Sequence, residues 1–567
     1  MNRNLRKLEL GKNILKSVCF FSANEIRRGT FLKNIPGVPK TEIIEEMSWG
    51  ELLEEKAARY KDKVFLLFED KTFTYRQMNE NASRMANYFL SLGAGQGKGV
   101  AMLMDNSPRF LDIFIGIQKI GMYAVPVNTS LKGDSLLYIL NHCDAEYLVI
   151  DETHLETLKK VADRLENIKT IIVNPPPASS GNYPKGYLVL DDAYKGSSVN
   201  PGIGYRKDDI CFITYTSGTT GLPKGVVYRY RKSSVKLLSL VSVMLFKQSD
   251  VLYTCMPLLH GNALFVTVTS ALHLGAQVVL ARKFSASRFW DDIIKYNVTT
   301  FNTIGAMIPI LMKQPEKPTD RQHKVRFIIS AACPADLWET FEKRFGLTIY
   351  ETYGAVDGGG KTILNLGTAP VGSIGKPPMK VQYRLVDANM NDVPDGTPGE
   401  LVFPVSNKNK SSSSVEYYKN EKASAEKMNG GYIFTGDLIR RDTDGFLYFI
   451  GRNTESMRIK GENVSAFEVE QAIKRNASVL EAAVYAVPSE LAEDDIMASI
   501  TLVEGMTLKE TDLIEYLQEN LPKFAVPRYV KIVPELPMTE THRVKKKELE
   551  MLKIVAGTWD ENKKAYV

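Results

Sequence analysis

The sequence predicts an α/β fold. Two related α/β layers and a small antiparallel β subdomain form a large N-terminal domain, and a small mobile α+β C-terminal domain follows. Short apolar runs alternate with helical periodicity over residues 72–151 and again over 250–346, as parallel sheets with crossover helices require. From about residue 370 the composition shifts to Gly, Pro and β-forming residues. At 567 residues the chain is too long for one core, at about 150 residues per domain.

The first α/β layer is predicted from residue 72 onward. Thr74 and Gln77 have the spacing of a capping box, and Gly93 marks the end of the helix that they begin. The helical face carries Met78, Ala82, Met85, Ala86 and Phe89. The apolar run GVAMLMDN is typical of a buried parallel strand. We expect further helices in SPRFLDIFIGIQKIG and LKGDSLLYILNHC, and strands in YAVPVN and EYLVID.

The same alternation returns after residue 250. Strands are predicted in DVLYTCMPL, AQVVLAR, TTFNTI and VRFIIS, and helices in GNALFVTVTSALHLG, FSASRFWDDIIKYN and ADLWETFEKRFG. Turn signals such as Pro-Asp-Gly then predict a small antiparallel sheet. Beyond GFLYFIGR we expect strands EAAVYAVP, IMASITLVE and VPRYVKIV, with helices FEVEQAIKRN and LKETDLIEYLQENL, the second capped by Thr507 and Glu510.

These patterns divide the chain. We expect an N-terminal extension at residues 1–40, a large domain at 41–451, a hinge at 452–454 and a small domain at 455–567. Chain length and composition set no oligomeric state.

Composition excludes several classes of protein. With 44% hydrophobic and 24% charged residues, the chain is predicted to be soluble and globular. A net charge of +6 is too small for its length to indicate a nucleic-acid partner. The five widely spaced cysteines fit neither a disulfide framework nor a zinc site and predict a reducing cytoplasm. No apolar run reaches the about 20 residues of a membrane span, although the basic, apolar N-terminus is compatible with peripheral membrane association.

Residues 215–225 read YTSGTTGLPKG, between apolar strands ending in CFITY and beginning with VVYRY. Glycines let backbone N–H groups converge on an anion, the hydroxyls add donors, and Lys224 adds a charge, so the segment suits a polyphosphate. It is not a Walker A loop, because G-x-x-x-x-G-K-[ST] is absent. A solvated hairpin turn uses the same residue types, so composition alone leaves both interpretations open.

This string closely resembles the phosphate-binding signature of the adenylate-forming superfamily, which contains acyl-CoA synthetases, firefly luciferase and peptide-synthetase adenylation domains. Matching elements follow in the family's order: ETYGAVD at 351–357, YIFTGD at 432–437, and Gly451-Arg452 with RIKGENVSAFEVE. The resemblance covers residues 45–560. Within the superfamily, NTSLKGDSLLYIL, LWETFEKRFG, GFLYFIGR and IKGENVS are most similar to the fatty-acid-transport-protein, or very-long-chain acyl-CoA synthetase, branch.

The resemblance implies a set of ATP-binding residues. The β- and γ-phosphates would be held by Thr216, Ser217, Gly218, Thr219, Thr220, Gly221 and Lys224. Tyr353 would stack on adenine, Asp437 would accept the ribose hydroxyls, and Arg452 would donate to ribose or phosphate. Ala332 and Gly354 complete the implied nucleotide site.

The resemblance also implies roles nearer the reacting groups. His260 matches the position that gates the acyl pocket, Asp357 the Mg²⁺ ligand, and Lys460 with Gly461 the border of the coenzyme A pantetheine tunnel. The implied catalytic residues are Lys224, Thr220, Asp357, Arg543 and His260.

The chain departs from the family pattern at three places. Asp357 replaces the usual Glu and follows Val356, which lacks a hydroxyl for the α-phosphate. Thr454 replaces the usual Asp or Lys of the hinge. His542-Arg543 replaces Gly-Lys, whose lysine bridges carboxylate and α-phosphate; Arg543, Lys545 and Lys546 are the candidates for that role. For the lysines at 545–547 an ordinary solvated face is the favoured interpretation.

These residues predict an ATP-dependent acyl-CoA ligase for a long or very long fatty acid. The carboxylate would attack the α-phosphate to give an acyl-adenylate and pyrophosphate, and the coenzyme A thiol would then displace AMP. The first step needs positioning and charge neutralisation, not a general base, because the carboxylate is already an anion. The sequence leaves open a small carnitine-like or aromatic acid, a carrier protein as acceptor, and a nucleotide- or acyl-binding protein without turnover.

Overall fold

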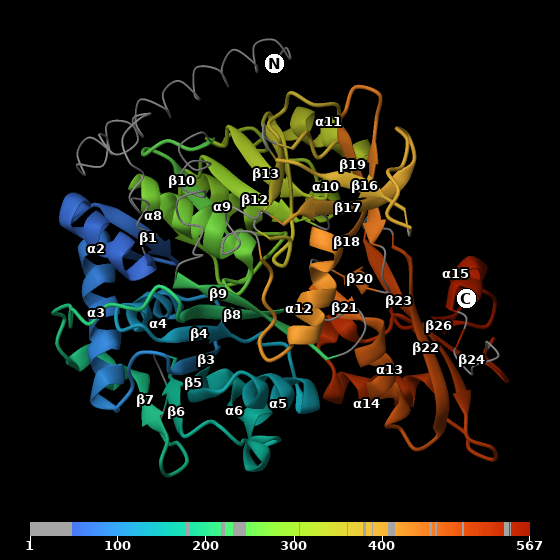
Figure 1. The fold of residues 1–567 in the computed structure, drawn as a ribbon, viewed down its shortest axis with the longest axis horizontal. Coiled ribbons are helices and arrows are strands. Elements are labelled where there is room, and N and C mark those ends of the chain that lie inside the picture. The colour runs from blue at the N-terminus through green and yellow to red at the C-terminus, as the bar shows by residue number, and fades with distance from the viewer. Residues whose placement is uncertain are drawn as a thin grey trace.

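The computed structural model describes residues 48–567 apart from 177–178, 180, 217–221, 231–244, 305–306, 360, 378–380, 388, 406–413, 453–455, 460–461, 490–492, 538–543 and 545. The predicted N-terminal extension, 1–40, therefore lies outside the described residues. Two large sheets build the N-terminal domain, and a smaller domain lies beside them at the C-terminal end (Figure 1). The prediction of two α/β layers with a smaller C-terminal domain is confirmed.

The first layer is a seven-stranded sheet in the order β7-β6-β5-β3-β4-β8-β9. Its strands pair in parallel except β8 and β9, which are antiparallel. The strands are β3 (Gly99–Leu103), β4 (Tyr123–Pro126), β5 (Ala145–Asp151), β6 (Thr170–Asn174), β7 (Leu188–Val189), β8 (Ile210–Thr216) and β9 (Lys224–Arg229). The helices of this stretch are α3 (Tyr75–Ser91), α4 (Pro108–Gln118), α5 (Gly133–His142) and α6 (Leu155–Lys159).

Helix α3 forms as its sequence predicts. The Thr74 hydroxyl accepts from the Gln77 backbone at 3.1 Å, and the Gln77 side chain accepts from the Thr74 backbone at 2.8 Å, which satisfies two of the helix's first donors. The predicted apolar face is fully buried.

The second layer is an eight-stranded sheet in the order β15-β14-β13-β12-β10-β11-β1-β2. Its strands are β1 (Val64–Phe68), β2 (Lys71–Thr74), β10 (Val251–Thr254), β11 (Gln277–Leu280), β12 (Thr300–Ile304), β13 (Phe327–Ala331), β14 (Thr348–Gly354) and β15 (Thr362–Asn365). The helices are α2 (Trp49–Tyr60), α8 (Ser270–Leu274), α9 (Phe289–Lys295), α10 (Met307–Met312) and α11 (Ala335–Phe345). Strand β1 pairs with β11, so the two layers exchange chain segments and share one hydrophobic core.

One helix of this layer differs from the sequence prediction. The segment GNALFVTVTSALHLG was expected to form one α-helix, but residues Asn262–Thr269 form a π-helix that leads into α8. The apolar, β-branched run Val266 to Val268 supplies the right hydrophobicity without specifying the wider turn, which sequence periodicity does not reveal.

The predicted antiparallel subdomain is present. It has the order β16-β17-β18-β19, with β16 (Arg384–Val386), β17 (Pro398–Pro404), β18 (Tyr432–Arg441) and β19 (Leu447–Arg452). Helix α12 (Glu421–Lys427) precedes β18 and begins at Asn420, whose side chain accepts from the Ala423 backbone at 2.9 Å.

The C-terminal domain has its own core between a five-stranded sheet and two helices. The sheet comprises β22 (Val479–Pro488), β23 (Asp494–Leu502), β24 (Tyr529–Ile532), β25 (Trp559–Asp560) and β26 (Ala565–Tyr566). The two helices of this core are α13 (Ala466–Lys474) and α14 (Glu510–Asn520). Helix α15 (Lys546–Leu552) belongs to a second cluster, and a hairpin of β20 (Ser456–Ile459) and β21 (Glu462–Ser465) precedes α13.

The predicted capping box of Thr507 and Glu510 is wrong. Helix α14 begins two residues later than this pair requires, with Lys509 at the N-cap and no capping side chain. Glu510 is instead the first helical residue, where a negative charge is favourable, and the Tyr566 hydroxyl donates to it at 2.9 Å.

Four cysteines are described, and all are buried and free, as expected: Cys143, Cys211, Cys255 and Cys333. Within the described part of the chain, no helix combines the length and apolarity needed to cross a membrane.

Candidate active site

The predicted phosphate segment joins the last two strands of the seven-stranded sheet. β8 ends at Thr216 and β9 begins at Lys224, and these residues are cross-strand partners. The Thr216 hydroxyl donates to the Lys224 carbonyl at 3.5 Å, which closes the base of the connection. Ser217, Gly218, Thr219, Thr220 and Gly221 lie outside the described residues, so their contact with phosphates stays a prediction.

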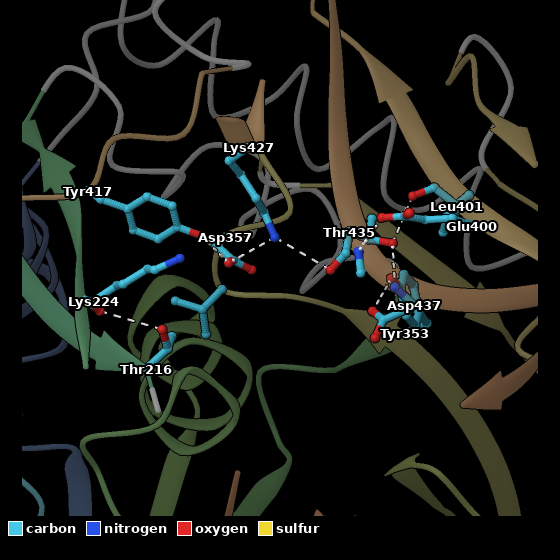
Figure 2. A network of polar contacts seen from close by, with 12 residues as sticks. Thr216, Lys224, Tyr353, Asp357, Glu400, Leu401, Tyr417, Lys427, Thr435 and Asp437 are labelled. Carbon is cyan, nitrogen blue, oxygen red and sulfur yellow. Dashed lines mark hydrogen bonds and ion pairs between the residues drawn. The ribbon is translucent and has the colours of Figure 1, made fainter. Parts of the chain in front are cut away.

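A cluster of charged and phenolic groups lies next to Lys224 (Figure 2). The Lys224 ammonium lies 5.3 Å from the centre of the Tyr417 ring. The Tyr417 hydroxyl donates to Asp357 Oδ2 at 2.5 Å, and the Lys427 ammonium lies 2.9 Å from the same oxygen. Burial, with the charge of Asp357, raises the pKa of Tyr417, so this phenol remains a donor.

Tyr353 and Asp437, predicted to bind the nucleoside, come together from two sheets. Tyr353 lies near the end of β14 and Asp437 in β18, and the phenol donates to Asp437 Oδ2 at 2.6 Å. The two side chains are only 8% and 4% exposed. Gly354 follows Tyr353 as the last residue of β14. The structure thus holds a carboxylate in a fixed orientation next to an aromatic ring.

The Thr-Gly-Asp pattern has a local cause. The Thr435 hydroxyl accepts from the Asp437 backbone at 3.1 Å and donates to the Leu401 carbonyl at 2.7 Å. Gly436 adopts φ +80°, which disfavours any residue with a Cβ. The Thr435 contacts fix the backbone at Asp437, whose side chain accepts from Tyr353.

Ala332 follows β13 with φ +65°, a left-handed conformation that is unusual for alanine. Its N–H donates to Glu351 Oε1 at 2.5 Å, and the Cys333 N–H donates to Glu351 Oε2 at 3.2 Å. Burial raises the pKa of Glu351 to about 8, although these two N–H groups oppose the shift. Glu351 therefore fixes the backbone beside the predicted nucleotide site.

His260 meets the C-terminal domain. Its Nε2 lies 3.1 Å from Glu462 Oε1, at the start of β21. Burial favours the neutral form of Glu462, but His260 and Arg458 outweigh it and hold the pKa of Glu462 below its ordinary value. Lys460 and Gly461, at the tip of this hairpin, lie outside the described residues.

Helix α5 carries most other described polar contacts between the domains. Asp134 pairs with Arg475 at 2.9 Å, and the Ser135 hydroxyl donates to Glu468. Just before the helix, the Lys132 ammonium donates to the Gln518 carbonyl at 2.9 Å. These contacts and the hairpin at His260 define the orientation of the C-terminal domain in this structure.

Two predicted residues of the hinge and C-terminal segment are only partly placed. Arg452 is the last residue of β19, opposite Asp437 in the strand register, and its side chain lies outside the described residues. Arg543 is also outside them. Its neighbour Val544 packs in a C-terminal cluster, and Lys546 pairs with Glu470 at 2.7 Å. Helix α15, which follows, lies at the outer edge of the C-terminal domain (Figure 1).

The site fits only a particular kind of metal binding. Magnesium in nucleotide sites is commonly held by one or two carboxylates, phosphate oxygens and water, and Asp357 offers one carboxylate. Within the described residues, a group of three metal-type ligands occurs only at Asp105, Asp151 and His154. The donor set around Asp357 therefore fits a metal that arrives with the triphosphate, not a resident ion held by protein ligands alone.

Residues 53–407 match the family model of the AMP-binding enzyme, and residues 468–543 match that of the AMP-binding enzyme C-terminal domain. The chain belongs to the AMP-binding enzyme family. This membership confirms the resemblance to adenylate-forming enzymes. With its acid–CoA ligase relatives, it identifies the chain as an AMP-forming acid–CoA ligase that uses ATP and coenzyme A.

Curated members of the AMP-binding enzyme family match nearly the whole chain. The medium/long-chain-fatty-acid–CoA ligase FadD6 of Mycobacterium tuberculosis is 31% identical over 88% of this chain and 85% of its own length. The crotonobetaine/carnitine–CoA ligase of Proteus mirabilis is 30% identical over 90% of this chain and 100% of its own. Long-chain fatty acid transport protein 2 of Rattus norvegicus is 30% identical over 90% and 88%.

A solved structure from the same family shares the fold. The crystal structure of the anthranilate CoA ligase AuaEII with anthranoyl-AMP superimposes on this chain with a TM-score of 0.67 and 25% sequence identity. The match covers 89% of this chain and 97% of the AuaEII chain. This likeness confirms the predicted architecture of a large and a small domain.

Sequence reasoning missed several residues at the site. Tyr417 and Lys427, which contact Asp357, lie outside any quoted family motif. Glu462 and Glu351 lie within quoted motifs, but no role was expected for either. Each of the four contacts a partner that lies 18 to 202 residues away in sequence. Only the proximity of the partners in the fold reveals these roles.

Proposed function

We propose that this ligase activates a fatty acid of long or very long chain as its acyl-adenylate and then transfers the acyl group to coenzyme A. The observation that carries the proposal is the network that joins Lys224 and Asp357 at one end to Asp437 and Tyr353 at the other (Figure 2). A nucleotide with its ribose at Asp437 and its terminal phosphates at Lys224 would cross that network at its α-phosphate.

The first half-reaction follows from the charges of the site. A carboxylate oxygen of the acid forms a bond to the α-phosphorus while the bond to pyrophosphate breaks. Lys224 would hold the β- and γ-phosphates, and Thr216 with residues 217–221 would supply neutral donors. Magnesium bound with the triphosphate would neutralise charge on its phosphates, and Asp357 would hold it.

The second half-reaction suits the orientation of the C-terminal domain. The hairpin of β20 and β21 reaches His260 through Glu462, so its tip, Lys460 and Gly461, is expected to border the route of the coenzyme A thiol. The thiol would attack the acyl carbonyl, and AMP would leave. Arg543 would serve the first half-reaction after rotation about residues 452–454.

The acid is the open question for the proposal. FadD6 and the rat transport protein are named for fatty acids, which supports a long-chain substrate. The π-helix after His260 is apolar, although Ala263, Leu264 and Val268 are buried in the core of the large domain. The long-chain assignment is carried over from relatives that are about 30% identical to this chain, and a direct test of the substrate follows below.

A small carboxylate is the second candidate, and one observation favours it. The ring of Phe265 lies 5.8 Å from Trp49, 5.7 Å from Phe212 and 6.0 Å from Tyr228. These aromatic rings pack around Phe265 of the π-helix, and a long acyl chain passing there would have to displace them. The carnitine-type relative matches over its full length.

A panel of acids tests the proposal. The full chain is incubated with ATP, magnesium, coenzyme A and acids of about six to 26 carbons, carnitine-like acids or aromatic acids, and the thioester is identified by its mass. Thioesters from the long acids alone support the proposal, and thioesters from carnitine-like or aromatic acids alone overturn the chain-length assignment. Phe265→Ala should shift the preference toward longer acids if the chain passes beneath the π-helix.

Pyrophosphate exchange separates the remaining alternatives. Carboxylate-dependent exchange without a coenzyme A thioester, but with transfer to a phosphopantetheinyl carrier protein, would favour a carrier-protein ligase. Nucleotide binding without exchange for any acid would indicate a protein without turnover.

A further inference from the structure

Lys427 occupies a position that the family motifs do not assign. It is the last residue of α12, and its side chain is 14% exposed. Lysine is seldom buried unless its ammonium has a partner. Here the ammonium lies 2.9 Å from Asp357 Oδ2 and donates to the Thr435 carbonyl at 3.4 Å.

The two partners of Lys427 belong to different halves of the site. Asp357 is bonded to Tyr417, whose ring lies under Lys224. Thr435 is bonded to the backbone of Asp437. Figure 2 shows the Lys427 ammonium between these two groups. The ammonium therefore lies between the predicted ribose site at Asp437 and the predicted site of the terminal phosphates at Lys224, where the α-phosphate of a bound nucleotide would be.

The ammonium has capacity for one more acceptor. Lysine carries three N–H donors, and two of them are directed to Asp357 and Thr435. Among the described residues, none accepts the third. Asp357 balances the charge of Lys427 before the nucleotide binds, which reduces the cost of holding a buried cation there.

We propose that Lys427 contacts the α-phosphate of the bound nucleotide and neutralises its charge in both half-reactions. The inference rests on the proposed adenylation and goes beyond it by adding a substrate-contacting residue. The carboxylate oxygen bonds to phosphorus as pyrophosphate leaves. Later the coenzyme A sulfur bonds to the acyl carbon, AMP leaves, and the thiol proton is released to solvent.

The placement of Lys427 on the large domain gives it a distinct role. Arg543 is the sequence-predicted cation for the α-phosphate, but it lies beyond the hinge and moves with the C-terminal domain. Its neighbours Val544 and Lys546 pack against that domain's own residues. Helix α12 and strand β18 both belong to the large domain, so Lys427 keeps its position while the C-terminal domain rotates.

Binding of AMP and adenosine to the full chain tests the inference without magnesium or catalysis. AMP carries the α-phosphate and adenosine lacks it, and calorimetry in EDTA measures both affinities. Lys427→Met should weaken AMP binding about tenfold, which corresponds to about 1.4 kcal/mol, and leave adenosine binding unchanged, because only AMP carries the phosphate that the ammonium would contact. Lys422→Met, an exposed lysine on the same helix, should change neither affinity.

Other outcomes overturn the inference. An equal loss of AMP and adenosine affinity would mean that Lys427 only supports the fold, and an unchanged AMP affinity would mean that it does not contact the phosphate. A wild type that binds AMP no better than adenosine overturns it as well. Asp357→Asn should not weaken AMP in EDTA, because it removes a negative charge near the phosphate. A tenfold loss there would show that Lys427 acts only by holding Asp357.

Two further points keep the test decisive. If Lys427→Met does not fold, as its circular dichroism and thermal melt would show, Lys427→Gln takes its place, because its amide can still donate to Thr435. If no acid gives a thioester with the wild type, the proposed function fails, while the comparison of AMP with adenosine still decides the role of Lys427.

Discussion

Replacing Tyr353 with phenylalanine tests whether the structure holds Asp437 for a ribose. The phenol donates to Asp437 Oδ2 at 2.6 Å, and the two side chains are 8% and 4% exposed. A hydrogen bond to a buried charged group contributes about 1.5–3 kcal/mol. We therefore expect Tyr353→Phe to lower the free energy of unfolding of the large domain by about 2 kcal/mol.

The same substitution should change how the site recognises the sugar. Without the phenol, the Asp437 carboxylate loses one restraint on its orientation toward the ribose hydroxyls. We expect the preference for ATP over 2′-deoxy-ATP, measured by pyrophosphate exchange, to fall about tenfold, which corresponds to about 1.4 kcal/mol. Urea unfolding supplies the stability measurement on the same protein.

A matched control separates burial from the chemistry of the pair. Tyr448 donates to Asp442 Oδ2 at 3.0 Å in the same part of the fold, but both residues are partly exposed. Tyr448→Phe should therefore cost less than about 1 kcal/mol and leave the sugar preference unchanged. The reasoning is refuted if Tyr353→Phe costs no more than this control. A stability loss with an unchanged sugar preference would refute the ribose role of Asp437.

Three other outcomes follow from the site. Lys224→Ala should reduce pyrophosphate exchange by about 100-fold or more through lost phosphate neutralisation, with thermal unfolding as the control for folding. Arg543→Ala should reduce exchange and spare thioester formation from a supplied acyl-adenylate; equal losses in both contradict its role. Because the pKa of Glu351 is raised from 4.5 to about 8, its stabilisation is complete below pH 4.5 and is lost as the pH rises through 8. Glu351→Gln should flatten that decline in thermal unfolding curves, and an unchanged slope would contradict the burial of Glu351 as an acid.

The parts of the fold that the sequence predicts are those with local causes. Helix α3 has a complete capping box at Thr74 and Gln77 and a regular apolar face, and it begins and ends within two residues of the prediction. The strand β3 is buried throughout, as its apolar run indicates. Periodicity and caps act between neighbours in sequence, so the sequence contains their full signal.

The errors have non-local causes. Strand β1 joins the second sheet beside β11. This pairing brings together residues such as Leu66 and Val278, which are more than 200 positions apart in sequence. At the start of α14, Glu510 accepts from Tyr566, which lies 56 positions away in sequence. Neither contact has a signature within a short window of sequence, because tertiary packing overrides weak local preferences there.

The candidate site divides in the same way. Tyr353 and Asp437 were identified because each lies in a recognisable motif, and the structure brings them into contact. Tyr417 and Lys427 have no motif, and their roles arise from the approach of α12 and its preceding segment to Asp357. Site residues that lie within a motif can be predicted from the sequence. Residues that bridge two motifs can be identified only in the folded structure.

Two of the three departures from the family pattern concern the reacting phosphates, and the third, Thr454, lies at the hinge. Val356, Asp357 and Arg543 all occupy positions whose expected function is to contact or neutralise the reacting phosphates. A cation on the C-terminal domain can serve only the orientation that brings it to the phosphate, and here that domain instead presents Glu462 to His260. If Arg543 were the only cation for the α-phosphate, that phosphate would have no cationic partner while AMP departs in the second half-reaction. A cation fixed on α12 removes that limit, which explains why a changed C-terminal cation is compatible with both half-reactions.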